Sequence, residues 1–79
     1  MNMEKAFVEY VVKSLVDEPE KVEITTIEGE TSTILELRVA EPDVGKVIGK
    51  HGRIARAIRT LLAAASSHDG KRVVLEILD

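Results

Sequence analysis

Apolar residues repeat with a helical period in two long stretches of the chain. Residues 2–16 carry apolar side chains on one side, which predicts an amphipathic helix with Asn2 as its N-cap. Pro19 ends this helix, because proline disfavours helix at the preceding residue and has no amide N–H to donate. Residues 53–67 show the strongest helical pattern of the chain. The side chains expected to face the core are Phe7, Val8, Val11 and Leu15 in the first helix, and Ile54, Ala57, Ile58, Leu61, Leu62 and Ala65 in the second.

Three other stretches alternate between apolar and polar residues, which is the period of a half-buried strand. They are residues 21–28, 32–40 and 71–78. A turn-forming sequence at 28–31 separates the first two, so these are predicted to form an antiparallel hairpin. The side chains expected to face the core are Val22, Ile24 and Thr26, then Leu35, Leu37 and Val39, then Val73, Leu75 and Ile77.

A short helix is predicted over residues 41–48, between the second strand and the long helix. Pro42 stands at its first helical position, where a missing N–H has no consequence. Gly49 ends it, and Gly70 is suited to a left-handed cap that closes the long helix after His68-Asp69. The prediction is an α+β fold in a single domain over residues 1–79, in the order helix, strand, strand, helix, helix, strand, with a three-stranded sheet packed on helices on one face.

The last two helices are joined by Gly49-Lys50-His51-Gly52, which we interpret as the functional site. Two glycines let the backbone turn sharply, through torsions closed to other residues, and a negatively charged group can then come close to the main chain. Lys50, Arg53 and the positive end of the following helix would all attract a phosphate there. The alternative is that the two glycines only form a tight turn between helices.

Charge is distributed unevenly along the chain. The formal net charge of −3 argues by itself against a nucleic-acid partner. The stretch from Val44 to His68 nevertheless has no acidic residue, and the rest of the chain carries all 14 acidic residues against six basic ones, a net charge of −8. This pattern predicts a positive face on a negative body, which is typical of polyanion binding, although a solvated helix face is the alternative. The basic residues of the acid-free stretch are Lys46, Lys50, Arg53, Arg56 and Arg59.

Several classes of function are disfavoured. The chain has no cysteine and no acidic pair near either histidine, so neither a metal nor another cofactor is expected. The segment 45–51 resembles a phosphate-binding P-loop, but its glycines are one residue too close and His51 replaces the required hydroxyl. No dinucleotide fingerprint or nucleophile–base pattern is present, so we predict that the protein is not an enzyme. No stretch approaches the ~20 apolar residues of a membrane span, so a cytoplasmic protein without membrane contact is expected.

The segment Val47-Ile48-Gly49-Lys50-His51-Gly52-Arg53-Ile54, set between a short and a long helix, resembles the KH-domain signature Val-Ile-Gly-x-x-Gly-x-x-Ile. The isoleucines that follow the loop here are Ile54 and Ile58, and Ala55 stands at the signature position. The extra helix and strand at the N-terminus resemble the type II variant of the domain. Because one module accounts for the whole chain, the sequence is similar to the small bacterial KH-domain family KhpA (YlqC-like).

This resemblance implies a cytoplasmic RNA-binding protein, an RNA chaperone or post-transcriptional regulator, that acts as a homodimer or with KhpB, a larger partner bearing a KH domain. It also implies a link to cell shape and peptidoglycan homeostasis. About four nucleotides of single-stranded RNA would place their backbone on the loop and their bases in an adjoining groove. The residues implied are Gly49, Lys50, His51, Gly52 and Arg53 at the backbone, Ile48 and Ile54 beneath the bases, and Lys46, Arg56 and Arg59 for longer-range attraction.

Small side chains occur on the long helix opposite its predicted core face. They would let a second helix approach closely, whereas a monomer normally has longer polar side chains there. We therefore predict a dimer interface on this helix, and the alternative function is a dimerisation module with little RNA binding of its own. The predicted interface residues are Thr60, Ala63, Ala64 and Ser67.

Overall fold

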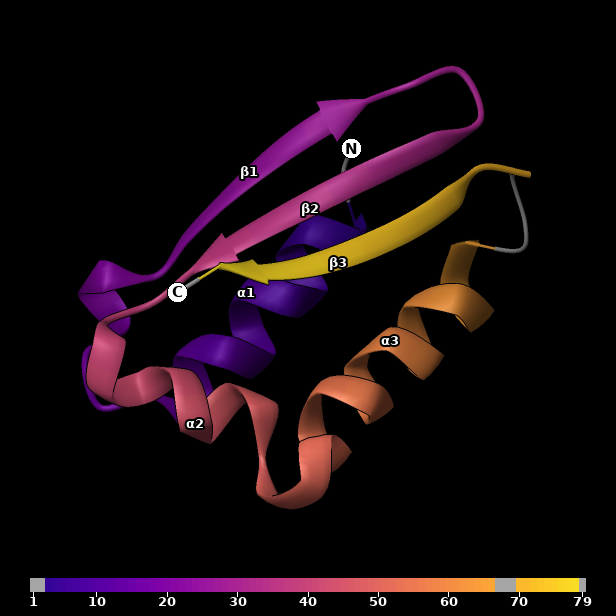
Figure 1. Ribbon diagram of the computed structural model, residues 1–79. Helices are drawn as coiled ribbons and strands as arrows, with labels where there is room; N and C mark the ends of the chain where they lie inside the picture. The colour runs from indigo at the N-terminus through magenta and orange to yellow at the C-terminus, as the bar shows by residue number, and fades with distance from the viewer. Residues whose placement is uncertain (1–2, 67–69, 79) are drawn as a thin grey trace.

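The computed structural model describes residues 3–66 and 70–78 and confirms the predicted α+β fold (Figure 1). The helices and strands are α1 (Met3–Leu15), β1 (Glu23–Glu28), β2 (Ser32–Arg38), α2 (Val44–Ile48), α3 (Arg53–Ser66) and β3 (Arg72–Leu78). Short 3₁₀ turns precede β1, α2 and α3, at Pro19–Lys21, Glu41–Asp43 and Lys50–Gly52.

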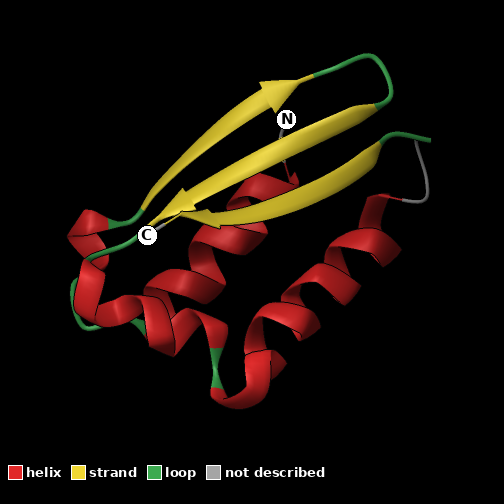
Figure 2. Ribbon diagram, in the orientation of Figure 1, coloured by secondary structure: helices red, strands yellow, loops and turns green. Residues whose placement is uncertain are grey.

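The three strands form one mixed sheet in the order β1-β2-β3. β1 and β2 pair antiparallel, which confirms the predicted hairpin, and β3 pairs parallel to β2. Leu35 at the centre of β2 is in register with Thr26 of β1 and Leu75 of β3. All three helices lie on one face of the sheet, and its other face is free of helices within the described residues (Figure 2). β3 is an edge strand and runs beside α3.

The core fills the space between the sheet and the helices. The strands contribute side chains at the predicted positions, because alternate residues of a strand face the same side. In α1, Val8 and Val12 are fully buried, and Val12 was not among the predicted core residues. The buried apolar side chains of the main cluster are Val8, Val12, Leu35, Leu37, Val47, Ile58, Leu62 and Leu75.

The predicted inward face of α3 is wrong in part. Ala55 and Ile58 face the core, whereas Ala57 and Ala65 are exposed and Leu61 is 54% exposed. The reason is that α3 is apolar over a wider arc than the sheet covers, and its many alanines do not distinguish one direction from another. Tertiary packing selected the direction through positions 55, 58 and 62, which leaves a second apolar stripe on the surface.

Several boundaries also differ from the prediction. β1 begins at Glu23 rather than at residue 21, because Lys21 N–H donates to Glu18 O and closes a 3₁₀ turn. β2 ends at Arg38, two residues early, as the chain turns into the segment before α2. Gly70 has the predicted left-handed φ of 78°. The predictions for Asn2 and for residues 67–69 lie outside the described residues. None of the described helices has the length and apolar character needed to cross a bilayer.

Candidate nucleic-acid interface

The Gly-x-x-Gly loop joins α2 to α3 through a single 3₁₀ turn. Gly49 N–H donates to Gly45 O at 2.9 Å, which ends α2, and Gly52 N–H donates to Gly49 O at 3.0 Å. Arg53 N–H donates to Lys50 O. The amides of Gly52 and Arg53 are therefore satisfied inside the turn, and an anion at the start of α3 would meet the helix dipole and side chains instead of these two donors.

The two glycines have different structural roles. Gly49 adopts φ 79° and ψ 169°, a region essentially restricted to glycine, and a Cβ there would lie 2.6 Å from Ile54 Cγ1. Gly52 has φ 73°, but a Cβ there would meet only Arg56 Nη2, at 3.7 Å. Packing of the chain itself thus requires a glycine at position 49. Gly52 is half-buried but not crowded, so the backbone of a ligand can approach the main chain there.

His51 between them is held in a left-handed conformation, with φ 59° and ψ 24°. This conformation is uncommon for a residue with a side chain, although histidine tolerates it better than most. Arg56 supports it, because its Nη2 donates to His51 O at 3.1 Å. Lys50, His51 and Arg53 are exposed, and none of them forms an ion pair within the described part of the chain. The loop therefore presents their side chains to solvent around the uncrowded main chain at Gly52.

The two isoleucines that flank the loop differ in exposure. Ile54 is half-buried and packs beneath Gly49, so it supports the loop from the core side. Ile48 is 37% exposed. Of the two residues predicted to lie beneath the bases, Ile48 thus has more surface available for contact with a ligand.

Lys46, which was predicted to attract RNA from a distance, forms two ion pairs within the fold. Its Nζ lies 3.2 Å from Asp17 Oδ2 and 3.6 Å from Asp43 Oδ1. The hydrogen bond and charge of Asp17 raise the pKa of Lys46, and Asp43 adds to the effect, while partial burial opposes it. Because two carboxylates offset its charge, Lys46 fastens α2 to the end of α1 within the fold.

Asp43 was not singled out from the sequence, yet it is the buried charged group that holds α2 in place. It is 1% exposed, and its two carboxylate oxygens accept from Asp17 N–H at 3.2 Å and from Glu18 N–H at 3.0 Å. Burial raises the pKa of Asp43, but the two backbone hydrogen bonds and Lys46 outweigh burial, so the net shift is downward. An acidic residue directly after Pro42 is a feature of the sequence that could have marked Asp43 as structural. The backbone amides that it contacts lie some 25 residues earlier in the chain, so the sequence alone did not indicate its partners.

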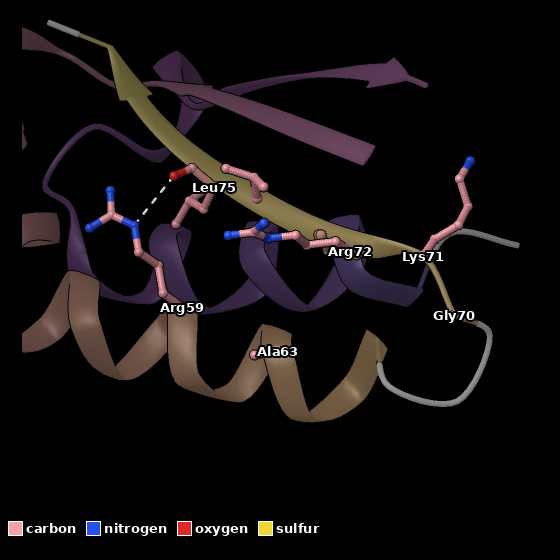
Figure 3. A pocket seen from close by; sticks show the side chains of 8 residues that line it. Arg59, Ala63, Gly70, Lys71, Arg72 and Leu75 are labelled. Atoms are coloured by element: carbon pink, nitrogen blue, oxygen red, sulfur yellow. Dashed lines mark hydrogen bonds between the residues drawn. The ribbon is translucent and has the colours of Figure 1, made fainter. Parts of the chain in front are cut away.

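A groove runs between α3 and the free edge of β3 (Figure 3). Its volume is about 450 Å³, and none of the described residues that line it is acidic. Arg59 crosses the groove from α3, and its Nε donates to Leu75 O at 3.3 Å. Sequence reasoning gave Arg59 only a long-range role and missed Lys71 and Arg72, since only the contact between α3 and β3 brings these three together. The lining residues are Arg59, Ala63, Gly70, Lys71, Arg72, Val73, Val74 and Leu75.

The residues of the predicted dimer interface do not all lie on the same surface. Thr60 and Ala64 are exposed, and the Thr60 hydroxyl donates to Arg56 O at 3.0 Å. Ala63 is also exposed but lines the groove beside β3. Ser67 lies outside the described residues. The exposed Leu61 adds a large apolar side chain to the stripe.

Comparisons with a family model and with individual proteins indicate the same family for this chain. Residues 5–77 match the family model described as KhpA/KhpB, KH domain. The chain is 62% identical over 72 residues to RNA-binding protein KhpA of Borreliella burgdorferi, which covers 91% of this chain and 88% of that protein. It is 56% identical to RNA-binding protein KhpA of Aquifex aeolicus over the full length of both chains. The protein of the same name from Treponema pallidum is 53% identical over all 79 residues of this chain and 99% of its own length. No solved structure matches.

Proposed function

Since the chain belongs to the KhpA/KhpB family of KH-domain proteins, we propose that it binds single-stranded RNA through the Gly-x-x-Gly loop and the adjoining α3–β3 groove. The observation that carries this proposal is the uncrowded main chain at Gly52 beside Lys50 and Arg53, whose exposed cationic side chains form no ion pair among the described residues. The names of the relatives from Borreliella burgdorferi and Aquifex aeolicus, both RNA-binding protein KhpA, support it.

The RNA backbone and the bases meet different parts of this surface. Lys50, His51 and Arg53 contact phosphates, and the missing side chain at Gly52 lets the sugar-phosphate chain reach the main chain. The bases enter the groove, where Arg59 and Arg72 contribute positive charge. None of the described residues that line the groove is aromatic, and Phe7 and Tyr10 both belong to α1. One module therefore binds weakly and with low sequence selectivity, which suits an RNA chaperone.

Two copies in a dimer would bind RNA more tightly than one, because the second contact becomes intramolecular. We propose that the dimer forms through the outer stripe of α3, which comprises the exposed residues Ala57, Thr60, Leu61 and Ala64. Leu61 is the large apolar side chain of this stripe, and the small residues around it leave room for a second helix to approach. A homodimer, or a mixed complex with a larger KhpB-like protein, would use the same stripe.

A dimerisation module without RNA binding is the second candidate function, and the exposed stripe on α3 is the observation that favours it.

The cytoplasm is the proposed location, and regulation of RNAs that affect cell shape and peptidoglycan homeostasis is the proposed role. Neither RNA binding nor dimerisation requires catalysis, and we propose that the protein is not an enzyme.

RNA binding is tested by fluorescence anisotropy, with a labelled unstructured RNA pool titrated at two salt concentrations. The variant Lys50→Asp/His51→Asp is expected to lose binding, because it places two carboxylates where phosphates would lie. The logarithm of the wild-type binding constant should fall with the logarithm of salt concentration, with a slope of roughly −0.7 per phosphate neutralised.

The matched control is Lys13→Asp/Ser14→Asp, which makes the same change in formal charge at exposed positions of α1. It should bind RNA nearly as well as the wild type. Equal binding by the wild type and the loop variant, or binding by neither, would rule out the loop as the RNA site and leave the dimerisation module as the better candidate.

A further inference from the structure

The free edge of β3 displays main-chain groups toward the groove. In a strand, the N–H and C=O of one residue point to the same side, and successive residues alternate between the two sides. Arg72 N–H donates to Thr31 O on the hairpin side, whereas Leu75 O accepts from Arg59 on the groove side. Val73 and Leu75 therefore direct their N–H and C=O groups into the groove, and Arg72 and Val74 direct theirs toward β2.

Arg59 changes the hydrogen-bonding character of this edge at Leu75. A bare edge would offer the Leu75 carbonyl as an acceptor to an amino group of a base. Its carbonyl oxygen instead receives Arg59 Nε at 3.3 Å, which places a guanidinium over the acceptor (Figure 3). Guanidinium has five N–H donors and no acceptor, so the remaining donors of Arg59 are available to a ligand beside Leu75. The groove thus presents donors where the strand alone would present an acceptor.

Within residues 3–66 and 70–78, no group that lines the groove reverses this effect. Arg72, which also lines the groove, is a second donor-only side chain, and no lining residue in these ranges is acidic. Arg56, one helical turn before Arg59, donates to His51 O at the loop and does not line the groove. Arg59 is therefore the described side chain of α3 that covers an acceptor on β3.

We propose that Arg59 sets the base preference of the groove, favouring bases with a carbonyl acceptor, such as uracil, over bases with an amino donor in its place, such as cytosine. The proposal rests on the proposed RNA binding. Uracil and cytosine have nearly the same size. Uracil has an acceptor oxygen at position 4 and a donor N3–H, whereas cytosine has a donor amino group at position 4 and an acceptor N3. With position 4 directed at Leu75, the uracil oxygen can accept from Arg59, whereas the cytosine amino group would face other donors or displace Arg59 from Leu75.

The test compares the affinities of labelled uridine and cytidine octamers, measured above neutral pH so that cytosine stays unprotonated. The wild type is expected to bind the uridine octamer roughly fivefold more tightly, which corresponds to one net hydrogen bond of about 1 kcal/mol. Arg59→Ala should bring the ratio close to one or reverse it, since the Leu75 carbonyl becomes free to accept from cytosine. Arg59→Lys keeps the charge but loses the planar fork, so its ratio should fall below that of the wild type.

Arg56→Ala is the matched control, because it removes the same charge from the same helix outside the groove. Both alanine variants should bind all RNA more weakly, but only Arg59→Ala should change the ratio, and thermal melts establish that each is folded. A wild-type ratio near one, a ratio retained in Arg59→Ala, or an equal change in Arg56→Ala would overturn the proposal while leaving RNA binding intact. Failure of the wild type to bind either octamer would instead remove the proposed function, and the base preference with it.

Discussion

At the scale of single residues, the two loop glycines are constrained by different neighbours. Gly49 has torsions that exclude side chains and lies against Ile54, so the fold itself requires it. Gly52 has a left-handed φ, but a Cβ there would make only an ordinary contact with Arg56 Nη2. The chain needs Gly52 mainly for its torsion, and the space left by its missing side chain is available to a ligand.

This difference predicts unequal costs for alanine substitution. Gly49→Ala should lower the free energy of unfolding by about 2–4 kcal/mol, because backbone strain adds to overpacking against Ile54. Gly52→Ala should cost only about 1 kcal/mol, the penalty of a left-handed residue, and yet weaken RNA binding. Urea unfolding followed by circular dichroism measures both.

Gly45→Ala is the control, since a Cβ at this helical position meets nothing within 4 Å. It should leave the free energy of unfolding unchanged or raise it by about 0.5–1 kcal/mol. Equal losses for Gly49→Ala and Gly52→Ala would contradict the packing role assigned to Ile54.

At the scale of elements, the loop is positioned by a connection between α1 and α2. Asp43 at the start of α2 accepts from the two backbone amides that follow α1, and Lys46 bridges to Asp17 one turn later. These contacts hold α2 in place, and the loop departs from the opposite end of this short helix at Gly49. α3 then continues from the loop and packs beside β3, which forms the groove.

The lowered pKa of Asp43 predicts how stability depends on pH. A carboxyl group whose pKa is lower in the folded than in the unfolded state stabilises the fold above its unfolded pKa, and this contribution is lost as pH falls through the folded pKa. Asp43→Asn should therefore be less stable than the wild type at neutral pH, and the difference should shrink toward zero as pH falls below the ordinary Asp pKa of about 4. Thermal melts across this range measure the difference.

Asp17→Asn is the comparison variant, because Asp17 contributes an exposed carboxylate to Lys46 and keeps its backbone amide for Asp43. Its loss of stability at neutral pH should be much smaller than that of Asp43→Asn. A constant difference between wild type and Asp43→Asn at all pH values would show that the charge of Asp43 is not what holds the two elements together.

At the scale of the whole molecule, charge and apolar surface are separated. The cationic residues of the acid-free stretch lie on α2, the loop and α3, whereas the helix-free face of the sheet carries Glu23, Glu36 and Glu76 together with Arg38 and Arg72. We expect this distribution to favour the approach of RNA from the helical side of the domain. The outer stripe of α3 lies on the helical layer away from the sheet, so a second copy can pack there while the loop of each protomer stays accessible.

Thr60→Glu/Ala64→Glu should shift the protein from dimer to monomer in sedimentation velocity, because two charges would be buried and face their own copies across a two-fold axis. Thr25→Glu/Thr31→Glu, at exposed positions of the hairpin, should remain a dimer. A Thr60→Glu/Ala64→Glu protein that still sediments as a dimer would exclude this stripe as the interface.

The sequence alone determined the order of elements, the hairpin and the position of the loop, because these follow from local rules. Alternation fixed the inward side of Leu35, Leu37 and Leu75, and glycine and proline marked the ends of the helices. The cationic loop was identified from residues adjacent in sequence, and so was the family resemblance that the comparisons confirm.

Only the tertiary structure decided which side of α3 is buried, since an alanine-rich helix fits the core in more than one rotation. It also decided that the exposed Lys46 pairs with acids, because Asp17 is distant in sequence and close in space. The groove depends on the pairing of β3 with β2, which brings Arg59 within hydrogen-bonding distance of Leu75. Local patterns do not encode contacts between residues far apart in the chain, and these contacts position the side chains around the loop.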